Sequence, residues 1–314
     1  MTTCASIDIS TIAGHLTGSP LELLSSTGPN GVFMPSIFSR LVFRYRQQTW
    51  RSRALPSFLI VGAQKAGTSS LCHYMRQHPQ LLRAWRKEAH FFDSGGEFLA
   101  KANDVASDQF LGGERCYRSY FPFASRVKDD QQCFEATPSY MYHPLAPERI
   151  VNMLPKVRVI MLLRNPTKRA VSNYFHNVRG GREPLPLLEA MLLEQDRLRE
   201  SLQKHDYSSF EFRNFSYKRR GLYLQQIQRY EKLLPRERML ILDSNELNTE
   251  PLATLRRAFE FVGVDPDFKV RRLDARNVGH GKSAADVDVL NHLDTYFRPH
   301  NEALRAHLGI DFGW

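Results

Sequence analysis

The sequence predicts an α/β fold in which a P-loop-like parallel β-sheet is flanked by helices. Three apolar runs have the length and residue types of buried parallel strands, at residues 58–61, 157–163 and 238–242. Helix signals follow them, at residues 68–77, from Pro166 onward and at 254–262. With 314 residues, the chain is long enough to bury the core of one large domain.

The N-terminal part differs in composition from the rest. Residues 1–55 are expected to form an arm that is partly disordered or helical, and residues 56–314 form the main domain. Within the arm, residues 36–54 interleave arginines with aromatic and aliphatic residues. We favour a helix that packs its aromatic side on the domain and leaves its arginines in solvent. Binding to a membrane or nucleic acid is the alternative.

Composition narrows the classes of partner. Lysine and arginine number 43 against 33 aspartates and glutamates, and a net charge of +10 favours anionic ligands. The four cysteines lack the spacing of metal ligands, so we expect no metal. No apolar run approaches the roughly 18–20 residues that span a bilayer, and residues 1–30 lack a signal-peptide pattern. We expect no stable membrane insertion and no nucleic-acid partner, and the oligomeric state stays open.

The run after the first strand has the pattern of a phosphate loop. Gly62 and Gly67 allow a tight turn, and the N–H groups of the loop and of the next helical turn converge on one anion site. The candidate contacts are Gln64, Lys65, Ala66, Gly67, Thr68 and Ser69. An ATP or GTP loop places its lysine after the second glycine, whereas Lys65 precedes Gly67. The spacing therefore indicates a different phosphate donor, and a glycine-rich turn without a ligand is the alternative.

Together with the stretches below, this loop resembles the sulfotransferases that use 3′-phosphoadenosine 5′-phosphosulfate (PAPS). The resemblance is strongest to the branch with the heparan sulfate glucosaminyl sulfotransferases and their bacterial relatives. It implies the sulfotransferase fold, and it places the 5′-phosphosulfate in the loop with Lys65 beside the bridging oxygen of the donor. The late disulfide of the Golgi heparan enzymes has no counterpart, since no cysteine follows Cys133. We therefore expect a cytoplasmic protein.

Two stretches are candidates for the chemistry. Glu88 and His90 lie two residues apart and project to the same side if the segment is a strand, which suits removal of a proton. In the family that this run resembles, the glutamate is the base; an ion pair with Lys87 or Arg86 is the structural alternative. Residues 134–140 resemble a stretch that borders the sulfate, although the animal heparan enzymes have lysine in place of Ala136.

The strand at 157–163 leads into a second candidate site. Asn165 and Pro166 have the residue types of a helix cap and first turn, so Arg164 is expected at the carboxyl end of the strand and Ser172 two turns into the helix. An arginine and a hydroxyl suit a phosphate monoester. The resemblance assigns this pair to the donor's 3′-phosphate. A salt-bridged arginine and a surface serine are the alternative.

The second half of the chain supplies weaker candidates. Residues 94–130 are expected to be loops and short helices that shape an acceptor cleft, 184–206 a long helix, and 208–215 a connector on the acceptor side. Arg220 and Gly221 are candidate cofactor contacts, because they precede a helix that the resemblance puts near the nucleotide; a solvated basic turn is the alternative. Lys282 is a further candidate, in a loop that resembles the late basic loop of the family that closes over PAPS. Asp243 ends a strand, as the Mg²⁺-organising aspartate of a kinase-like protein does.

These features predict a PAPS-dependent sulfotransferase in which Glu88 takes the acceptor proton and Lys65 stabilises the departing phosphate oxygen. The acceptor is a hydroxyl or amine, and we expect a small molecule in a cleft lined by His90, Tyr140, Tyr207 and Phe210. A heparan-like carbohydrate is the first alternative. A P-loop kinase or a noncatalytic nucleotide-binding protein is the alternative of another class.

Overall fold

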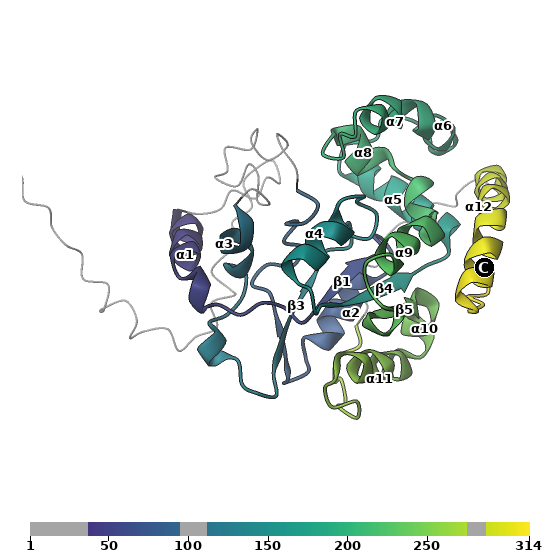
Figure 1. Cartoon of the computed structure of the whole chain (residues 1–314). Helices are drawn as coiled ribbons and strands as arrows, with labels where there is room; N and C mark the ends of the chain where they lie inside the picture. Colours follow the sequence, from purple (N-terminus) through teal and green to yellow (C-terminus); the bar gives the residue numbers. More distant parts are fainter. Residues whose placement is uncertain (1–36, 95–111, 275–286) are drawn as a thin grey trace, which may run out of the picture. The chain divides into compact units, whose positions relative to one another are not determined.

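A computed structural model of the chain describes residues 37–94, 112–274 and 287–314 (Figure 1). The chain divides into two compact units, residues 1–45 and 46–314, and the second contains the whole β-sheet. The elements, in chain order, are α1 (Ile37–Gln48), η2 (Trp50–Ser52), β1 (Phe58–Gly62), α2 (Thr68–Met75), β2 (Leu81–Arg83), α3 (Gly113–Arg118), η4 (Ala124–Arg126), β3 (Gln132–Ala136), α4 (Ala146–Met153), β4 (Arg158–Leu163), α5 (Pro166–Arg179), α6 (Leu187–Leu192), α7 (Glu194–Gln203), α8 (Phe210–Phe215), η5 (Arg219–Gly221), α9 (Tyr223–Glu231), η6 (Arg236–Arg238), β5 (Met239–Asp243), α10 (Ser244–Thr249), α11 (Pro251–Val262) and α12 (Val287–Leu308).

The sheet is entirely parallel, with strand order β2-β3-β1-β4-β5. Phe58 of β1 pairs with Phe134 of β3 on one side and with Arg158 of β4 on the other. The three predicted strands are β1, β4 and β5, and each is confirmed within one residue at either end. Because all five strands run the same way, their carboxyl ends meet at one edge, where open α/β sheets bind ligands.

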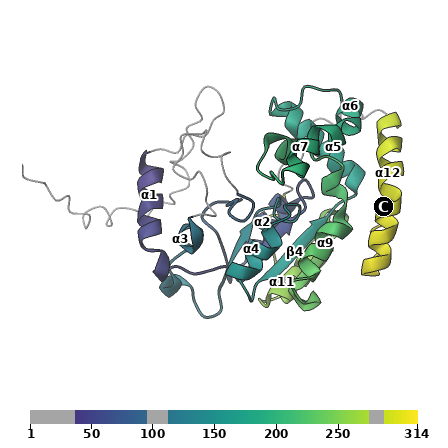
Figure 2. The ribbon, with the colours of Figure 1, turned by 45° about the horizontal axis from the view of Figure 1, so that its top comes forward.

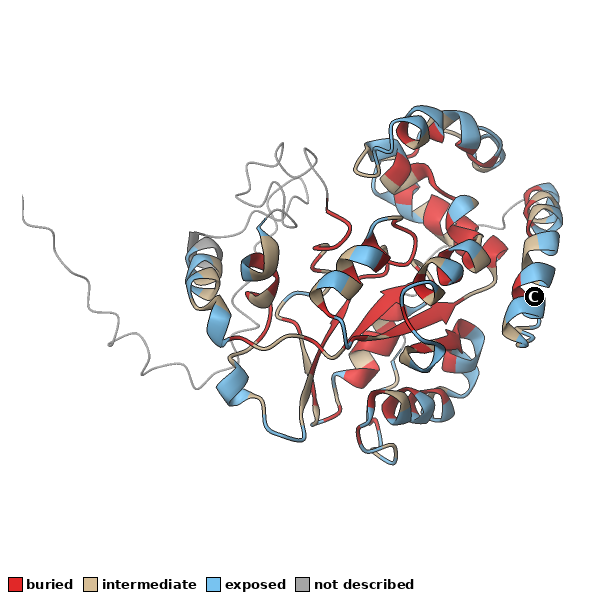
Figure 3. Cartoon of the chain, viewed as in Figure 1, coloured by how far each residue is buried: buried red, intermediate tan, exposed pale blue. Residues whose placement is uncertain are grey.

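Helices cover the sheet and leave its strands in the core. All of β1 is buried, as are the last five residues of β4, and the strands stand out as buried in Figure 3. Helix α2 packs against α11, while α12 lies beside α5 and α9 (Figure 2). Burial on both faces explains why these strands read as continuous apolar runs in the sequence.

Several expected elements differ from the observed ones. The long helix expected at 184–206 is two helices, α6 and α7, which meet at Leu193. The connector at 208–215 is largely the helix α8, which begins after the Ser209 cap, where the Ser209 side chain accepts from the Phe212 N–H. The segment that carries Glu88 and His90 is not a strand, because β2 ends at Arg83 and the chain then bends.

The arginines before β1 anchor the chain instead of projecting into solvent. Arg53 is 2% exposed and donates to the Phe121 carbonyl at 2.9 Å, and Arg46 donates to the same carbonyl at 2.8 Å. The expectation of solvated arginines is therefore wrong for these two. Residues 46–55 therefore belong to the main unit, which starts at Arg46 and not at residue 56. Among the described residues, no helix combines the length and hydropathy that a membrane span needs.

Candidate active site

The predicted phosphate loop joins β1 to α2 at the carboxyl edge of the sheet. Gly62 lies so close to Met141 that an added Cβ would come 2.4 Å from Met141 Cβ. Gly67 has φ 99°, a left-handed conformation that glycine adopts without steric cost, and it directly precedes Thr68, the first residue of α2. The tight turn thus leads straight into a helix amino terminus, which favours a bound anion.

The side chains of the loop are placed at several depths. Gln64, Lys65 and Ser69 are half-buried, Thr68 is buried, and Gly67 is exposed. The N–H of Ala66 donates to the Ala63 carbonyl at 3.1 Å, so this residue closes the turn with its backbone.

Cationic side chains gather beside the loop. Arg164 follows β4 and donates Nη1 to the Lys65 carbonyl at 2.8 Å, while the Tyr223 hydroxyl donates to the Arg164 carbonyl at 2.7 Å. Burial lowers the pKa of Lys65, and the nearby charges of Arg179, Arg164 and Arg169 lower it further. The structure therefore brings the two predicted donor-site cations, Lys65 and Arg164, into one positively charged region.

Helix α5 carries the other predicted phosphate contact. Asn165 caps the helix, with its side chain accepting from Lys168 N at 2.9 Å, and Pro166 occupies the first helical position, as predicted. Ser172 is half-buried on this helix. Gly221 packs against the helix start, because an added Cβ would lie 2.9 Å from Pro166 Cβ and 2.7 Å from Phe297 Cε1. Gly221 thus serves close packing at this point.

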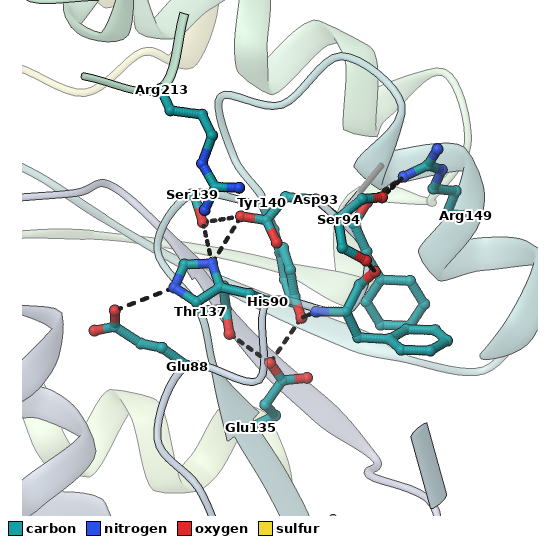
Figure 4. Close-up of polar contacts among 12 residues, drawn as sticks. Glu88, His90, Asp93, Ser94, Glu135, Thr137, Ser139, Tyr140, Arg149 and Arg213 are labelled. Atoms are coloured by element: carbon teal, nitrogen blue, oxygen red, sulfur yellow. Dashed lines mark hydrogen bonds and ion pairs between the residues drawn. The ribbon is translucent and has the colours of Figure 1, made fainter. Parts of the chain in front are cut away.

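Glu88 and His90 are brought together by a loop and not by a strand (Figure 4). Both residues have left-handed backbones, with φ of 61° and 51°, so the expected strand alternation is wrong. Their side chains still meet, with His90 Nε2 3.6 Å from Glu88 Oε2. The other ring nitrogen, Nδ1, lies 2.9 Å from Asp93 Oδ2, which also accepts from the Ser139 hydroxyl. An imidazole therefore bridges two carboxylates.

Lys87 connects this group to the phosphate loop. Its Nζ donates to Ser69 Oγ at 2.5 Å and to Glu88 Oε1 at 2.6 Å. Burial acts to raise the pKa of Glu88, but the contacts with His90 and Lys87 lower it to about 2. Burial acts to lower the pKa of His90, but the charges and hydrogen bonds of Asp93 and Glu88 together outweigh it and raise the pKa to about 10. At neutral pH, a carboxylate faces an imidazolium.

The buried carboxyl group of Glu135 anchors the turn that carries Glu88 and His90 through a hydrogen-bond network. Glu135 of β3 is fully buried and accepts from the hydroxyls of Thr137 at 2.5 Å and Tyr140 at 2.8 Å (Figure 4). It also accepts from the Tyr117 hydroxyl at 2.7 Å. The Tyr140 hydroxyl in turn accepts from the Phe91 N–H at 2.9 Å. Residue 91 follows His90 directly, so this network holds the turn that carries the two candidate catalytic groups. The sequence analysis missed it.

The two groups open into a cleft of about 320 Å³. Its lining residues are Gln64, Glu88, His90, Asp93, Ser139, Tyr142, His143, Asn173, His176, Asn177, Arg182, Tyr207, Phe212, Arg213, Asn214 and Arg220. His90 and Tyr207 line the cleft as expected, but Tyr140 is buried beneath it, and Phe212 lines it in place of Phe210. Of the expected wall at 94–130, the described part does not line the cleft.

Comparison with known families decides the identity. Residues 55–277 match the sulfotransferase domain. The chain belongs to the sulfotransferase family. This confirms the predicted family and fold class.

Individual sulfotransferases show which branch is similar. Mouse heparan sulfate glucosamine 3-O-sulfotransferase 6 is 29% identical over 285 residues, covering 83% of this chain and 74% of the relative. The human enzyme of the same name has the same identity and coverage. The crystal structure of a sulfotransferase from Alicyclobacillus acidocaldarius superposes with a TM-score of 0.65 at 29% identity, covering 82% of this chain and 97% of that one.

Lys282 and Asp243 are the last two residues that the sequence singled out. Lys282 lies outside the described residues. Asp243 caps α10, with its Oδ1 accepting from Asn245 N at 2.9 Å, which gives this carboxylate a structural role at the end of β5. Within residues 37–94, 112–274 and 287–314, no cluster of histidine, cysteine, aspartate or glutamate could hold a metal ion.

Proposed function

We propose that this sulfotransferase moves a sulfuryl group from PAPS to a hydroxyl group of a carbohydrate acceptor. One observation carries the proposal: Lys87 contacts Ser69 of the predicted donor loop and Glu88 of the cleft at the same time. The donor loop and the candidate base are therefore separated by a single side chain. The names of the similar heparan sulfate sulfotransferases support a sugar as acceptor.

The residues present fit the charges of the donor. Lys65 supplies a cation beside the amino terminus of α2, which suits a 5′-phosphosulfate. Arg164 and Ser172 are the proposed contacts for the 3′-phosphate, with the bidentate guanidinium matching a phosphate monoester. Gln64, Gly67, Thr68 and Ser69 would complete the loop. These cations neutralise the charge that develops on the leaving phosphate.

In the transfer, Glu88 accepts the acceptor proton while a new bond forms between the acceptor oxygen and sulfur. The bond between sulfur and the bridging phosphate oxygen breaks, and Lys65 stabilises the oxygen that departs, leaving adenosine 3′,5′-bisphosphate. The low pKa of Glu88 keeps it ionised and ready at neutral pH. Because a group of low pKa is a weak base, Glu88 takes the proton late, once attack on sulfur has made the hydroxyl acidic.

His90 holds Glu88 in place and carries a positive charge between Glu88 and Asp93. Asp93 orients the imidazole of His90, as a carboxylate orients the histidine in other acid–base sites. The imidazole in turn holds the Glu88 carboxylate in the cleft.

A small-molecule acceptor, which the sequence led us to expect first, is now the second candidate. The cleft of about 320 Å³ lies at the lower end of the range that encloses small ligands, roughly 300–1,000 Å³. Tyr207 and Phe212 offer aromatic faces within it. A compact hydroxylated or amine-bearing molecule would fit such walls.

The test supplies PAPS and two acceptor pools, glycosaminoglycan-derived oligosaccharides and a small-metabolite extract, and mass spectrometry identifies which pool gains a sulfuryl group. We expect labelling of oligosaccharides, and labelling of metabolites alone would replace the sugar with a small molecule. Calorimetry provides the donor arm: adenosine 3′,5′-bisphosphate should bind without Mg²⁺ and more tightly than ATP. Mg²⁺-dependent ATP binding that ignores the 3′-phosphate would refute PAPS as the donor.

A further inference from the structure

Arg220 is the most deeply buried cation in the wall of the cleft. It lies in η5, its residue is 5% exposed, and its guanidinium carbon stands 4.4 Å from the centre of the Tyr142 ring. Nη2 donates to the Arg213 carbonyl at 3.1 Å. Its Nε and Nη1 atoms are buried without a hydrogen-bond partner in the described part of the chain. Two N–H-bearing nitrogens of a buried cation are thus left for a ligand.

The nearby carboxylates are already engaged elsewhere. Asp93, whose charge reaches Arg220, is paired with His90 and Ser139. Glu194, the buried carboxylate next to this turn, accepts from the N–H groups of Lys218 at 2.5 Å and Arg219 at 2.9 Å. A buried guanidinium without a counter-charge is costly, so an anion in the cleft would stabilise it.

Other buried polar atoms of the cleft also lack hydrogen-bond partners among the described residues. Asn173 Nδ2, Gln64 Oε1 and Asp93 Oδ1 are buried without partners among the described residues, and all three side chains line the cleft. Such a mixture of donors and acceptors suits a ligand with several hydroxyl groups. The guanidinium adds a site for one anionic group on that ligand.

Arg220 lies in the cleft of the candidate base. It lines the same cleft as Glu88 and His90, and Gln64 of the donor loop reaches this cleft as well. The proposed donor contacts Lys65, Arg164 and Ser172 do not line it. An anion held by Arg220 therefore belongs to the molecule whose hydroxyl Glu88 deprotonates.

We infer that Arg220 determines acceptor specificity by binding a carboxylate or sulfate group of the acceptor, so that the acceptor is an anionic sugar and not a neutral one. This inference rests on the proposed function, since it assigns the cleft to the acceptor. Carboxylates and sulfates share the planar or fork-like oxygen arrangement that a guanidinium binds through two N–H groups.

The test measures binding to the protein saturated with adenosine 3′,5′-bisphosphate. Three disaccharide probes differ in one group: glucuronosyl-N-acetylglucosamine, its carboxyl-reduced form, and the N-sulfated version of the carboxyl-reduced form. We expect calorimetry to show about 10- to 100-fold tighter binding of at least one anionic probe than of the neutral probe, the usual range for a bond to a charged group. The preferred probe distinguishes carboxylate from sulfate.

The variant Arg220→Gln should bind the neutral probe as the wild type does and lose the preference for the anionic probe. Arg220→Lys keeps the positive charge but loses the paired N–H groups of the guanidinium, so it should retain part of the preference. This variant tests the inference if Arg220→Gln does not fold. Arg219→Gln is the matched control, because Arg219 is adjacent, exposed and outside the cleft. It should keep the wild-type preference.

Equal binding of all probes by the wild type, or no binding of any, would overturn the inference, as would an equal loss of preference in Arg219→Gln. A parallel assay of sulfuryl transfer from PAPS keeps the two proposals distinct. Transfer without anion preference refutes the role of Arg220 alone. Anion-selective binding without transfer to any probe refutes the proposed reaction on that sugar while leaving Arg220 as its binding residue.

Discussion

Removal of the Tyr140 hydroxyl should weaken both the fold and the catalytic turn. This hydroxyl donates to Glu135 Oε1 at 2.8 Å and accepts from Phe91 N–H at 2.9 Å, and all three residues are fully buried. In Tyr140→Phe, the carboxyl group loses one of its three donors and the amide has no water to replace its partner. Because residue 91 follows His90, the damage falls on the segment that carries Glu88 and His90.

The two lost contacts set the magnitude. A hydrogen bond to a carboxyl oxygen contributes about 1–3 kcal/mol, and an unpaired buried N–H costs about 1–3 kcal/mol. We expect the free energy of unfolding to fall by about 2–6 kcal/mol. Turnover of the folded protein should fall by about tenfold or more, because small displacements of catalytic groups are costly.

Tyr230→Phe is the matched control. Tyr230 is also fully buried, and its hydroxyl donates a single bond to the Tyr140 carbonyl at 3.0 Å. Its loss should cost about 1 kcal/mol. Urea denaturation monitored by fluorescence gives both values, and sulfuryl transfer measured on the folded fraction gives the catalytic effect. Equal destabilisation of the two variants, with unchanged turnover in Tyr140→Phe, would refute the reasoning.

Three further predictions concern the site itself. Glu88→Gln should lower turnover by about 10²-fold or more with unchanged affinity for adenosine 3′,5′-bisphosphate, and unchanged turnover would remove Glu88 as the base. Arg164→Ala should weaken that affinity by about 10- to 100-fold in calorimetry, and an unaltered affinity would place the 3′-phosphate elsewhere. Against the effect of burial, Asp93 and Glu88 together raise the pKa of His90 to about 10. The stability that the charged His90 contributes is therefore complete below pH 6.5 and is lost as the pH rises through 10. The unfolding free energy of the wild type should therefore decline over this range, and His90→Gln should flatten the decline; parallel curves would contradict the pairing.

The sequence predicts the strands that are apolar throughout and misses those that carry polar groups. Residues 58–61 and 157–163 identify β1 and β4 because both strands are buried on both faces. Strand β3 contains Glu135 in its buried part, a residue that the pattern does not place in a core. Its burial depends on hydroxyls from Tyr117, Thr137 and Tyr140, and these meet only after folding.

The site shows the same division. The residue types at the ends of two strands predicted Lys65 and Arg164 as separate contacts of the donor. The parallel sheet places them side by side, because the two residues follow adjacent strands. The closeness of Glu88 and His90 was expected from strand alternation, whereas it results from two left-handed residues in a turn. A pattern of period two cannot reveal such a turn. The two Arg220 nitrogens that have no partner in the described part of the chain cannot be found from the sequence either, because they depend on which side chains surround them after folding.

The placement of charge explains why a sulfotransferase of this kind needs no single strong base. Burial lowers the pKa of Lys65, and repulsion by the charges of Arg179, Arg164 and Arg169 lowers it further. A donor that carries several negative charges relieves the repulsion among these cations. Relief of this repulsion therefore contributes to the binding energy of the donor. In the proposed reaction, the same positive region then stabilises the leaving phosphate as the bond to sulfur breaks. In that proposal Glu88, which is joined to this region through Lys87, has only to receive a proton that the reaction is already releasing.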